Sequence, residues 1–151
     1  KSIKKWQSMS LKNVIDTLEG GNDVNGKRHN HLRRLTPEAL KKGHQHLQKN
    51  ELTLKNSNSF KEIHNVTVSI SKKIHGLGEM WAYDTAFAIG AHIQQLPKLI
   101  YLHRGTRTGA RKILNKTNLG SSLKRSDLPP ELWKLECYEL EDFLCHYIKF
   151  V

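Results

Sequence analysis

Two glycines one residue apart, Gly76 and Gly78, form the pattern in this chain that is best suited to binding an anion. A phosphate oxygen must come within about 3 Å of main-chain nitrogens to accept their hydrogen bonds, and glycine has no Cβ to obstruct that approach. Glycine also adopts the positive-φ conformations that a tight turn requires. An apolar helix is expected to begin at Glu79, and its free N–H groups favour negative charge. The segment Gly76-Leu77-Gly78 is therefore predicted to bind a phosphate.

Glu79 is the residue that opposes this interpretation, because its carboxylate repels a phosphate if both lie on the same side of the turn. The same carboxylate can instead cap N–H groups in the first turn of the helix. The sequence leaves both alternatives open. It also leaves open a tight connection between two helices that binds no ligand.

Residues 104–111 contain a second set of groups suited to phosphate. Backbone N–H groups, threonine hydroxyls and guanidinium groups are the donors that hold phosphates in proteins. The segment lacks the Gly-Lys-Ser/Thr ending of a Walker A loop. We expect residues 103–115 to form a glycine-rich turn followed by a basic helix; the alternative is a capped helix with a solvated basic face. The predicted binding residues are Arg104, Gly105, Thr106, Arg107, Thr108, Gly109, Arg111 and Lys112.

The net charge of +11 is unevenly distributed along the 151 residues. Residues 1–55 carry 12 Lys and Arg against 5 Asp and Glu, and residues 56–126 carry 11 against 3. Residues 127–151 reverse the sign, with 2 against 6. A basic surface of this strength attracts polyanions through counterion release, although it can also serve solubility alone. Membrane binding is not expected, because no strongly amphipathic basic helix carries aromatic anchors.

Histidine and aspartate side chains supply the candidates for catalysis. His29, His31 or His103 can act as a general base in phosphodiester cleavage, with Asp84 orienting the histidine. The alternative is that these side chains are exposed or structural, with Asp84 paired to an arginine. His44 and His46 point in different directions on a helix, and no spacing matches a metal motif. We expect no metal and no cofactor.

The elements that must position these residues are predicted to be helices. Ser10, Thr36 and Ser59 are candidate N-caps. The segment 79–94 is apolar nearly all round, which indicates a buried central helix, whereas residues 66–70 also alternate like a strand. Residues 96–103 are expected to be a short helix or extended. The predicted helices are 11–19, 37–49, 60–73, 79–94 and 138–150. Together they predict an all-α fold in a single compact domain over residues 1–151.

The segment from Ile74 to Ala82 resembles the hairpin of the helix-hairpin-helix superfamily, in the order apolar, any, Gly, apolar, Gly, three residues, Ala. Within that superfamily the likeness is to the base-excision DNA glycosylases. The resemblance implies a hairpin over about residues 60–94 that grips DNA from the minor-groove side. Small Ala82 and Ala86 would let the first helix of the hairpin pack closely on the second.

The catalytic residues of the glycosylases do not carry over to this chain. Their aspartate falls at Gln94, Gln95 or Leu96, and the lysine of the bifunctional members falls at Glu79-Met80. Two cysteines cannot form the four-cysteine cluster of some members. Three further segments, 83–86, 101–107 and 141–145, resemble a family of small, uncharacterised bacterial proteins, and this likeness implies no activity.

The two cysteines and the absence of long apolar runs bear on the compartment. Cys137 and Cys145 are expected on one helix, about 12 Å apart along its axis, which is too far for a disulfide. No apolar run reaches the roughly 18–20 residues that span a bilayer, and no hydrophobic segment follows the basic N-terminus. We expect a cytoplasmic protein.

The function predicted from these patterns is binding of nucleic acid, DNA more than RNA, through backbone phosphates and without catalysis. Two alternatives stay open. One is a nucleic-acid-processing enzyme, either glycosylase-like or a histidine-dependent nuclease. The other is a protein-interaction domain whose basic face meets an acidic partner. The acidic C-terminal helix is expected to pack on the basic body, to cover the nucleic-acid surface or to bind a partner.

Overall fold

Three helices begin after short polar side chains, as the sequence predicts. The computed structural model describes residues 3–27 and 34–147. In it Ser10, Thr36 and Ser59 each accept a hydrogen bond from the backbone N–H three residues further on. These bonds satisfy N–H groups that have no acceptor within the helix. The helices that follow have the predicted bounds: α2 is Leu11–Glu19, α3 is Pro37–Lys49 and α5 is Phe60–Lys73.

The chain divides into two compact units, Lys1–Leu96 (unit 1) and Pro97–Val151 (unit 2). A single domain is the expectation from the sequence, and no Pro/Gly/Ser-rich linker marks the division. The all-α fold class is confirmed, because the only strands among the described residues are a pair of two residues each. Each unit is described by itself.

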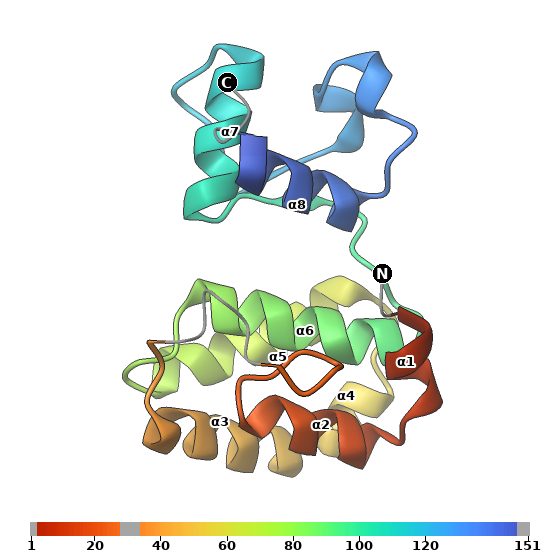
Figure 1. Cartoon of the computed structure of the whole chain (residues 1–151), viewed down its shortest axis with the longest axis vertical. Coiled ribbons are helices and arrows are strands. Elements are labelled where there is room, and N and C mark those ends of the chain that lie inside the picture. The colour runs from red at the N-terminus through yellow and green to blue at the C-terminus, as the bar shows by residue number, and fades with distance from the viewer. Residues whose placement is uncertain (1–2, 28–33, 148–151) are drawn as a thin grey trace. The chain divides into compact units, whose positions relative to one another are not determined.

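Helix α6, Glu79–His92, is the central helix of unit 1, as its apolar sequence predicts (Figure 1). It packs against α5, α1 and α2, and most of its side chains from Trp81 to Ala91 are buried. The strand alternative for residues 66–70 is wrong, because these residues lie within α5. Two short helices were not predicted: α1 is Ile3–Ser8 and α4 is Glu51–Lys55. Segments of this length show too little periodicity to be recognised.

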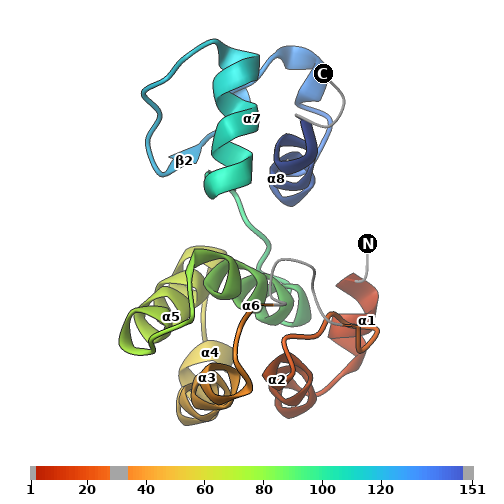
Figure 2. The same ribbon diagram turned by 60° about the vertical axis from the view of Figure 1, so that its left-hand side comes forward.

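Unit 2 is built on the packing of helix α7, Arg104–Leu114, against helix α8, Cys137–His146. The two helices lie side by side in Figure 2. An antiparallel pair joins Ile100 to Leu123 and Tyr101 to Ser122. The core side chains are Ile100, Leu102, Ala110, Leu123, Leu128, Cys137, Leu140 and Leu144. The elements are β1 (Ile100–Tyr101), α7 (Arg104–Leu114), β2 (Ser122–Leu123), η2 (Arg125–Asp127), η3 (Pro130–Leu132) and α8 (Cys137–His146).

Two helix ends differ from the predicted bounds. Helix α6 ends at His92 because Gln94 adopts a positive φ of 62° and Gln95 N–H donates to the Gly90 carbonyl at 2.7 Å. Helix α8 ends at His146, and residues 148–150 of the predicted helix lie outside the described residues. Residues 96–103 are extended around β1 rather than helical. Within the described residues no helix is both long enough and apolar enough to cross a membrane.

Candidate nucleic-acid interface

The turn between α5 and α6 alternates buried and exposed residues. Ile74 and Leu77 are each 6% exposed, whereas His75, Gly76 and Gly78 are exposed. Leu77 N–H donates to the Ile74 carbonyl at 3.3 Å and closes the turn. Gly76 has a φ of +99°, which side-chain-bearing residues rarely adopt. The apolar residues therefore fix the turn to unit 1 while the glycine backbone faces outward.

Leu77 packs against α3, and this contact holds the turn on the core of unit 1. A Cβ added at Gly43 of α3 would lie 3.0 Å from Leu77 Cδ1 and 2.9 Å from Trp81 Cζ2, so only glycine fits there without rearrangement. A Cβ added at Gly76 would lie 3.4 Å from the Cβ of Ala39. The side chain of Leu77, predicted among the binding residues, thus serves the core.

Gly78 is the most open position of the turn. It is the N-cap of α6, with φ −110° and ψ −166°. A Cβ placed on it would meet no heavy atom within 4 Å in the described part of the chain. Glycine offers no side chain to cap the helix, and the N–H groups of the first turn of a helix have no acceptor within it. An anion at this position can approach the backbone without displacing a side chain.

Exposed charged residues adjoin the turn in sequence or adjoin residues of α3 that pack on it. Lys72 and Lys73 occupy the last turn of α5, and Lys42 of α3 precedes Gly43, which packs on Leu77. Glu79, which follows Gly78 directly, is exposed and carries the opposing charge. Exposed Glu38 of α3 likewise precedes Ala39, which lies near Gly76, so charges of both signs flank the turn.

Ala82, one of the two small residues predicted to allow close packing of the hairpin, lies where its two helices are in contact, and Ala86 is buried within unit 1. Ala82 and Ala86 are completely buried, and Thr67 Oγ1 of α5 donates to the Ala82 carbonyl at 2.7 Å. This bond between a side chain and a backbone carbonyl fixes α5 to α6. The hairpin over residues 60–94 is thereby a well-packed pair of helices whose connecting turn is exposed.

The glycine-rich turn predicted at residues 104–111 is wrong, because α7 begins at Arg104 and both glycines lie inside the helix. They allow α7 to pack closely on α8. A Cβ at Gly109 would collide with the carbonyl oxygen of Leu144, and one at Gly105 would lie 3.1 Å from Cys145 Sγ. These glycines face a neighbouring helix, so they are not available to a phosphate.

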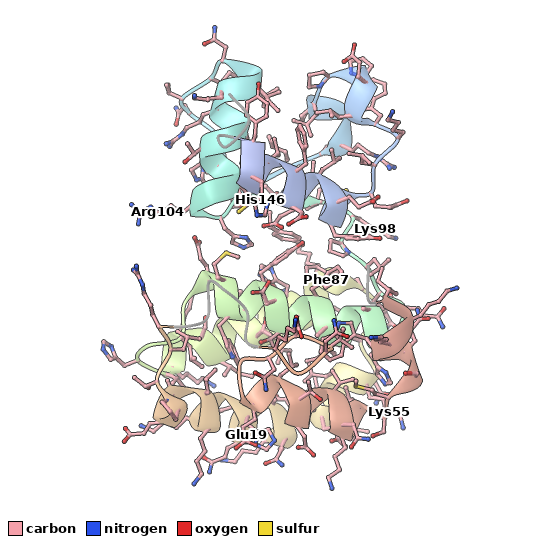
Figure 3. The ribbon with its side chains drawn as sticks, in the orientation of Figure 1. Glu19, Lys55, Phe87, Lys98, Arg104 and His146 are labelled. Carbon is pink, nitrogen blue, oxygen red and sulfur yellow. The ribbon has the colours of Figure 1, made fainter. Side chains whose placement is uncertain are left out.

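Arg107 and Thr106, two further predicted binding residues, hold unit 2 together. The Arg107 guanidinium donates to the carbonyls of Leu119 at 2.9 Å, Gly120 at 3.0 Å and Leu102 at 3.3 Å. Thr106 is 1% exposed, and its hydroxyl donates to Glu141 Oε1 at 3.0 Å. The predicted residues that remain on the outside of α7 are half-buried Thr108 and the exposed Arg104, Arg111 and Lys112. Figure 3 shows Arg104 at the start of the helix, directed outward.

The catalytic candidates are placed in different units. Asp84 is half-buried in α6 of unit 1. His103 of unit 2 is 5% exposed at the N-cap of α7, and its Nδ1 lies 3.7 Å from Glu141 Oε1. His29 and His31 lie outside the described residues.

Glu141 is a buried carboxylate of the acidic C-terminal helix α8. It is 8% exposed and lies between Thr106 and His103. The signal that predicts this burial is its spacing, because Cys137, Glu141 and Leu144 lie at i, i+4 and i+7 on one stripe of α8. A carboxylate on a buried stripe requires a hydrogen-bond donor, and Thr106 supplies it.

Residues 3–27 and 34–147 contain no group of three or more His, Cys, Asp or Glu side chains placed to hold a metal ion. His44 instead bridges α3 to α2, with Nε2 2.9 Å from Asp16 Oδ1 and Nδ1 3.5 Å from Glu19 Oε2. Both cysteines are free thiols on α8. These groups therefore serve the helix packing of their own units.

Comparison with known proteins gives no relative: no protein-family model, curated protein or solved structure matches the chain. The resemblance of residues 74–82 to the helix-hairpin-helix superfamily therefore stays a prediction. The two candidate surfaces are the turn at Gly76–Gly78 and the outer face of α7.

Proposed function

We propose that this protein binds nucleic acid, DNA in preference to RNA, through the phosphate backbone. The principal contact is the turn Gly76–Gly78 together with the N-terminus of α6. The observation that carries the proposal is the geometry of Gly78, which combines an N-cap position, open space and no side chain. A phosphate placed there accepts hydrogen bonds from backbone N–H groups and interacts favourably with the helix dipole.

Charge supports a polyanionic ligand in both units. Unit 1 contains 15 Lys and Arg against 8 Asp and Glu, and unit 2 contains 10 against 6. Cations next to backbone donors are the usual means of fixing a protein on the phosphates of a nucleic acid without reading its bases. The proposal includes no catalytic step, since Gln94, Gln95 and Leu96 stand where the glycosylase aspartate would fall.

The test of the proposal is Gly78→Val, with affinity measured by fluorescence anisotropy on a labelled DNA duplex at low salt. Valine is compatible with the extended backbone of Gly78, and its Cβ would have no heavy atom within 4 Å, so the variant should keep its fold. Its side chain nevertheless occupies the space through which a phosphate approaches. We expect the dissociation constant to rise about tenfold, which corresponds to roughly 1.4 kcal/mol and to the loss of a charge-assisted contact.

The matched control is Gly120→Val. Gly120 is an exposed loop glycine of unit 2 where an added Cβ likewise meets no heavy atom within 4 Å. This control should bind DNA as the unmodified protein does. Equal affinity of both variants, with their circular dichroism unchanged, would remove the turn from the interface. Absence of any DNA binding by the unmodified protein at low salt would end the proposal itself.

A further inference from the structure

The two sides of α7 are sharply different. Its inner side consists of Thr106, Gly109 and Ala110, all buried, and the glycine brings the backbone of α7 against that of α8. Arg107 ties the flank of the helix to the loop at Leu119–Gly120. The helix is therefore held in unit 2 by backbone contact on one side and by a guanidinium on another.

The outer side of α7 is a continuous polar stripe. Residues 104, 108, 111, 112 and 115 recur at the spacing of one helical face. Arg111 and Lys112 are exposed, and within the described residues no carboxylate forms an ion pair with either of them. Asn115 ends the helix in the left-handed conformation, and exposed Lys116 follows it. Arg111 and Lys112 thus place two exposed positive charges on this face, and no carboxylate in the described chain forms an ion pair with either of them.

Resting on the proposed function, we infer that this face of α7 lies in the major groove of duplex DNA. A helix of about 10–12 Å diameter matches a groove of about 12 Å width. The groove of A-form RNA is too narrow and deep for side chains on a helix to read. Arginine, asparagine and threonine are also side chains that hydrogen-bond to base edges in that groove.

The composition of the face distinguishes a duplex from a single strand. Proteins that bind single strands stack the bases on aromatic side chains, and residues 104–116 contain no aromatic residue. The apolar residues of α7, Ile113 and Leu114, pack against the core of unit 2 rather than outward. The face therefore offers cations and hydrogen-bond donors to a groove, with no platform for an exposed base.

The experiment compares a DNA duplex of 20 base pairs, the single strand of the same sequence and the matching RNA duplex, by anisotropy of an end label. The double substitution Arg111→Glu with Lys112→Glu places two negative charges on the face without touching the inner side. We expect the unmodified protein to bind the DNA duplex about tenfold more tightly than the other two probes. The double variant should lose this preference, because two negative charges repel the phosphates on either side of the groove and keep the face out of it. Its control is Lys134→Glu, an exposed lysine of unit 2 outside α7, which should retain the preference.

Protection of guanine N7 from dimethyl sulfate locates the contact, because N7 lies in the major groove. The unmodified protein should protect it and the double variant should not.

Equal affinity for the three probes, an unchanged preference in the double variant or unprotected N7 would each overturn the inference. If Gly78→Val still weakens binding in that case, the proposed function stands without it. If the unmodified protein binds no probe at low salt, both fail. A face that serves an acidic protein instead would give an unchanged nucleic-acid affinity in the double variant.

Discussion

Arg107 and Arg111 lie one helical turn apart in α7 and have different roles. The guanidinium of Arg107 donates to three backbone carbonyls, one of them from the buried residue Leu102. Arg111 is exposed. The burial of an arginine head group therefore decides whether it stabilises the fold or is available to a ligand. A change at Arg107 cannot test DNA binding, because it alters unit 2 first.

Replacement of Arg107 by alanine should destabilise unit 2 by about 1–3 kcal/mol, since carbonyls lose hydrogen bonds from a charged donor. Arg111→Ala, the matched change on the outer face, should stay within about 0.5 kcal/mol. Hydrogen exchange of the α8 amides measures both values. Similar protection factors in the two variants would show that the carbonyl contacts of Arg107 do not stabilise unit 2.

Burial raises the pKa of the Cys137 thiol above its ordinary value of 9.0; neighbouring Glu136 raises it further, and Arg125 opposes the shift. Burial likewise raises the pKa of Tyr101 above 10.0, and the charge of Cys137 adds to this. Both groups are neutral when protonated, and the unfolded chain ionises them first. Their contribution to stability is therefore complete below about pH 9. It is lost as the pH rises through the pKa values of these groups in the folded protein.

The free energy of unfolding should accordingly fall as the pH rises above about 9, as measured by urea titrations followed by circular dichroism. Cys137→Ala should make this fall shallower, because one of the two shifted groups is absent. The two proteins are compared by the slope of the unfolding free energy against pH, because the substitution also removes packing contacts at every pH. An identical slope in the two proteins would mean that Cys137 titrates equally in the folded and unfolded chains.

At the scale of elements, the helices are predicted where the signals are local. Ser10, Thr36 and Ser59 cap helices within a few residues of themselves, so their starts follow from the sequence. The role of the glycines of α7 cannot be predicted locally, because it depends on α8, some 35 residues further along the chain. The boundary between the two units at Leu96 has no counterpart in residue composition, which does not change there.

Gly109→Ala tests the close packing of α7 on α8. Alanine is the better helix former by about 1 kcal/mol, so an exposed site would gain stability. At Gly109 the added Cβ collides with a backbone carbonyl of α8, and we expect a net loss of about 2 kcal/mol or more. At Gly105 the nearest atom to an added Cβ is the Cys145 sulfur at 3.1 Å, and the backbone oxygen of Cys145 is 3.7 Å away, so Gly105→Ala should change stability less. Thermal melts compare the two variants. If Gly109→Ala is as stable as Gly105→Ala, the helices are not in backbone contact.

At the scale of the whole molecule, both units carry a net positive charge, and each presents its own candidate surface. Unit 1 offers backbone donors at the turn Gly76–Gly78, and unit 2 offers the outer face of α7. The sequence predicts the charge and the turn. It does not predict that the second surface is a helix face, because Gly105 and Gly109 suggest a loop.

Binding should therefore depend steeply on salt, since each neutralised phosphate releases counterions. The logarithm of the association constant for a DNA duplex should fall linearly with the logarithm of the salt concentration. The slope should become shallower in Arg111→Glu with Lys112→Glu, because fewer phosphates are neutralised. A slope near zero for the unmodified protein would exclude phosphate contacts as the source of affinity.

The most direct test of the central claim is a titration of the ¹⁵N-labelled protein with a short DNA duplex at low salt, followed by amide chemical shifts. If backbone N–H groups of the turn hold a phosphate, the amides of Gly76, Gly78, Glu79 and Met80 should shift on addition of DNA. They should return toward their free positions as salt is added. Shifts confined to other residues, with these amides unmoved at saturation, would contradict the claim that the hairpin turn is the phosphate contact.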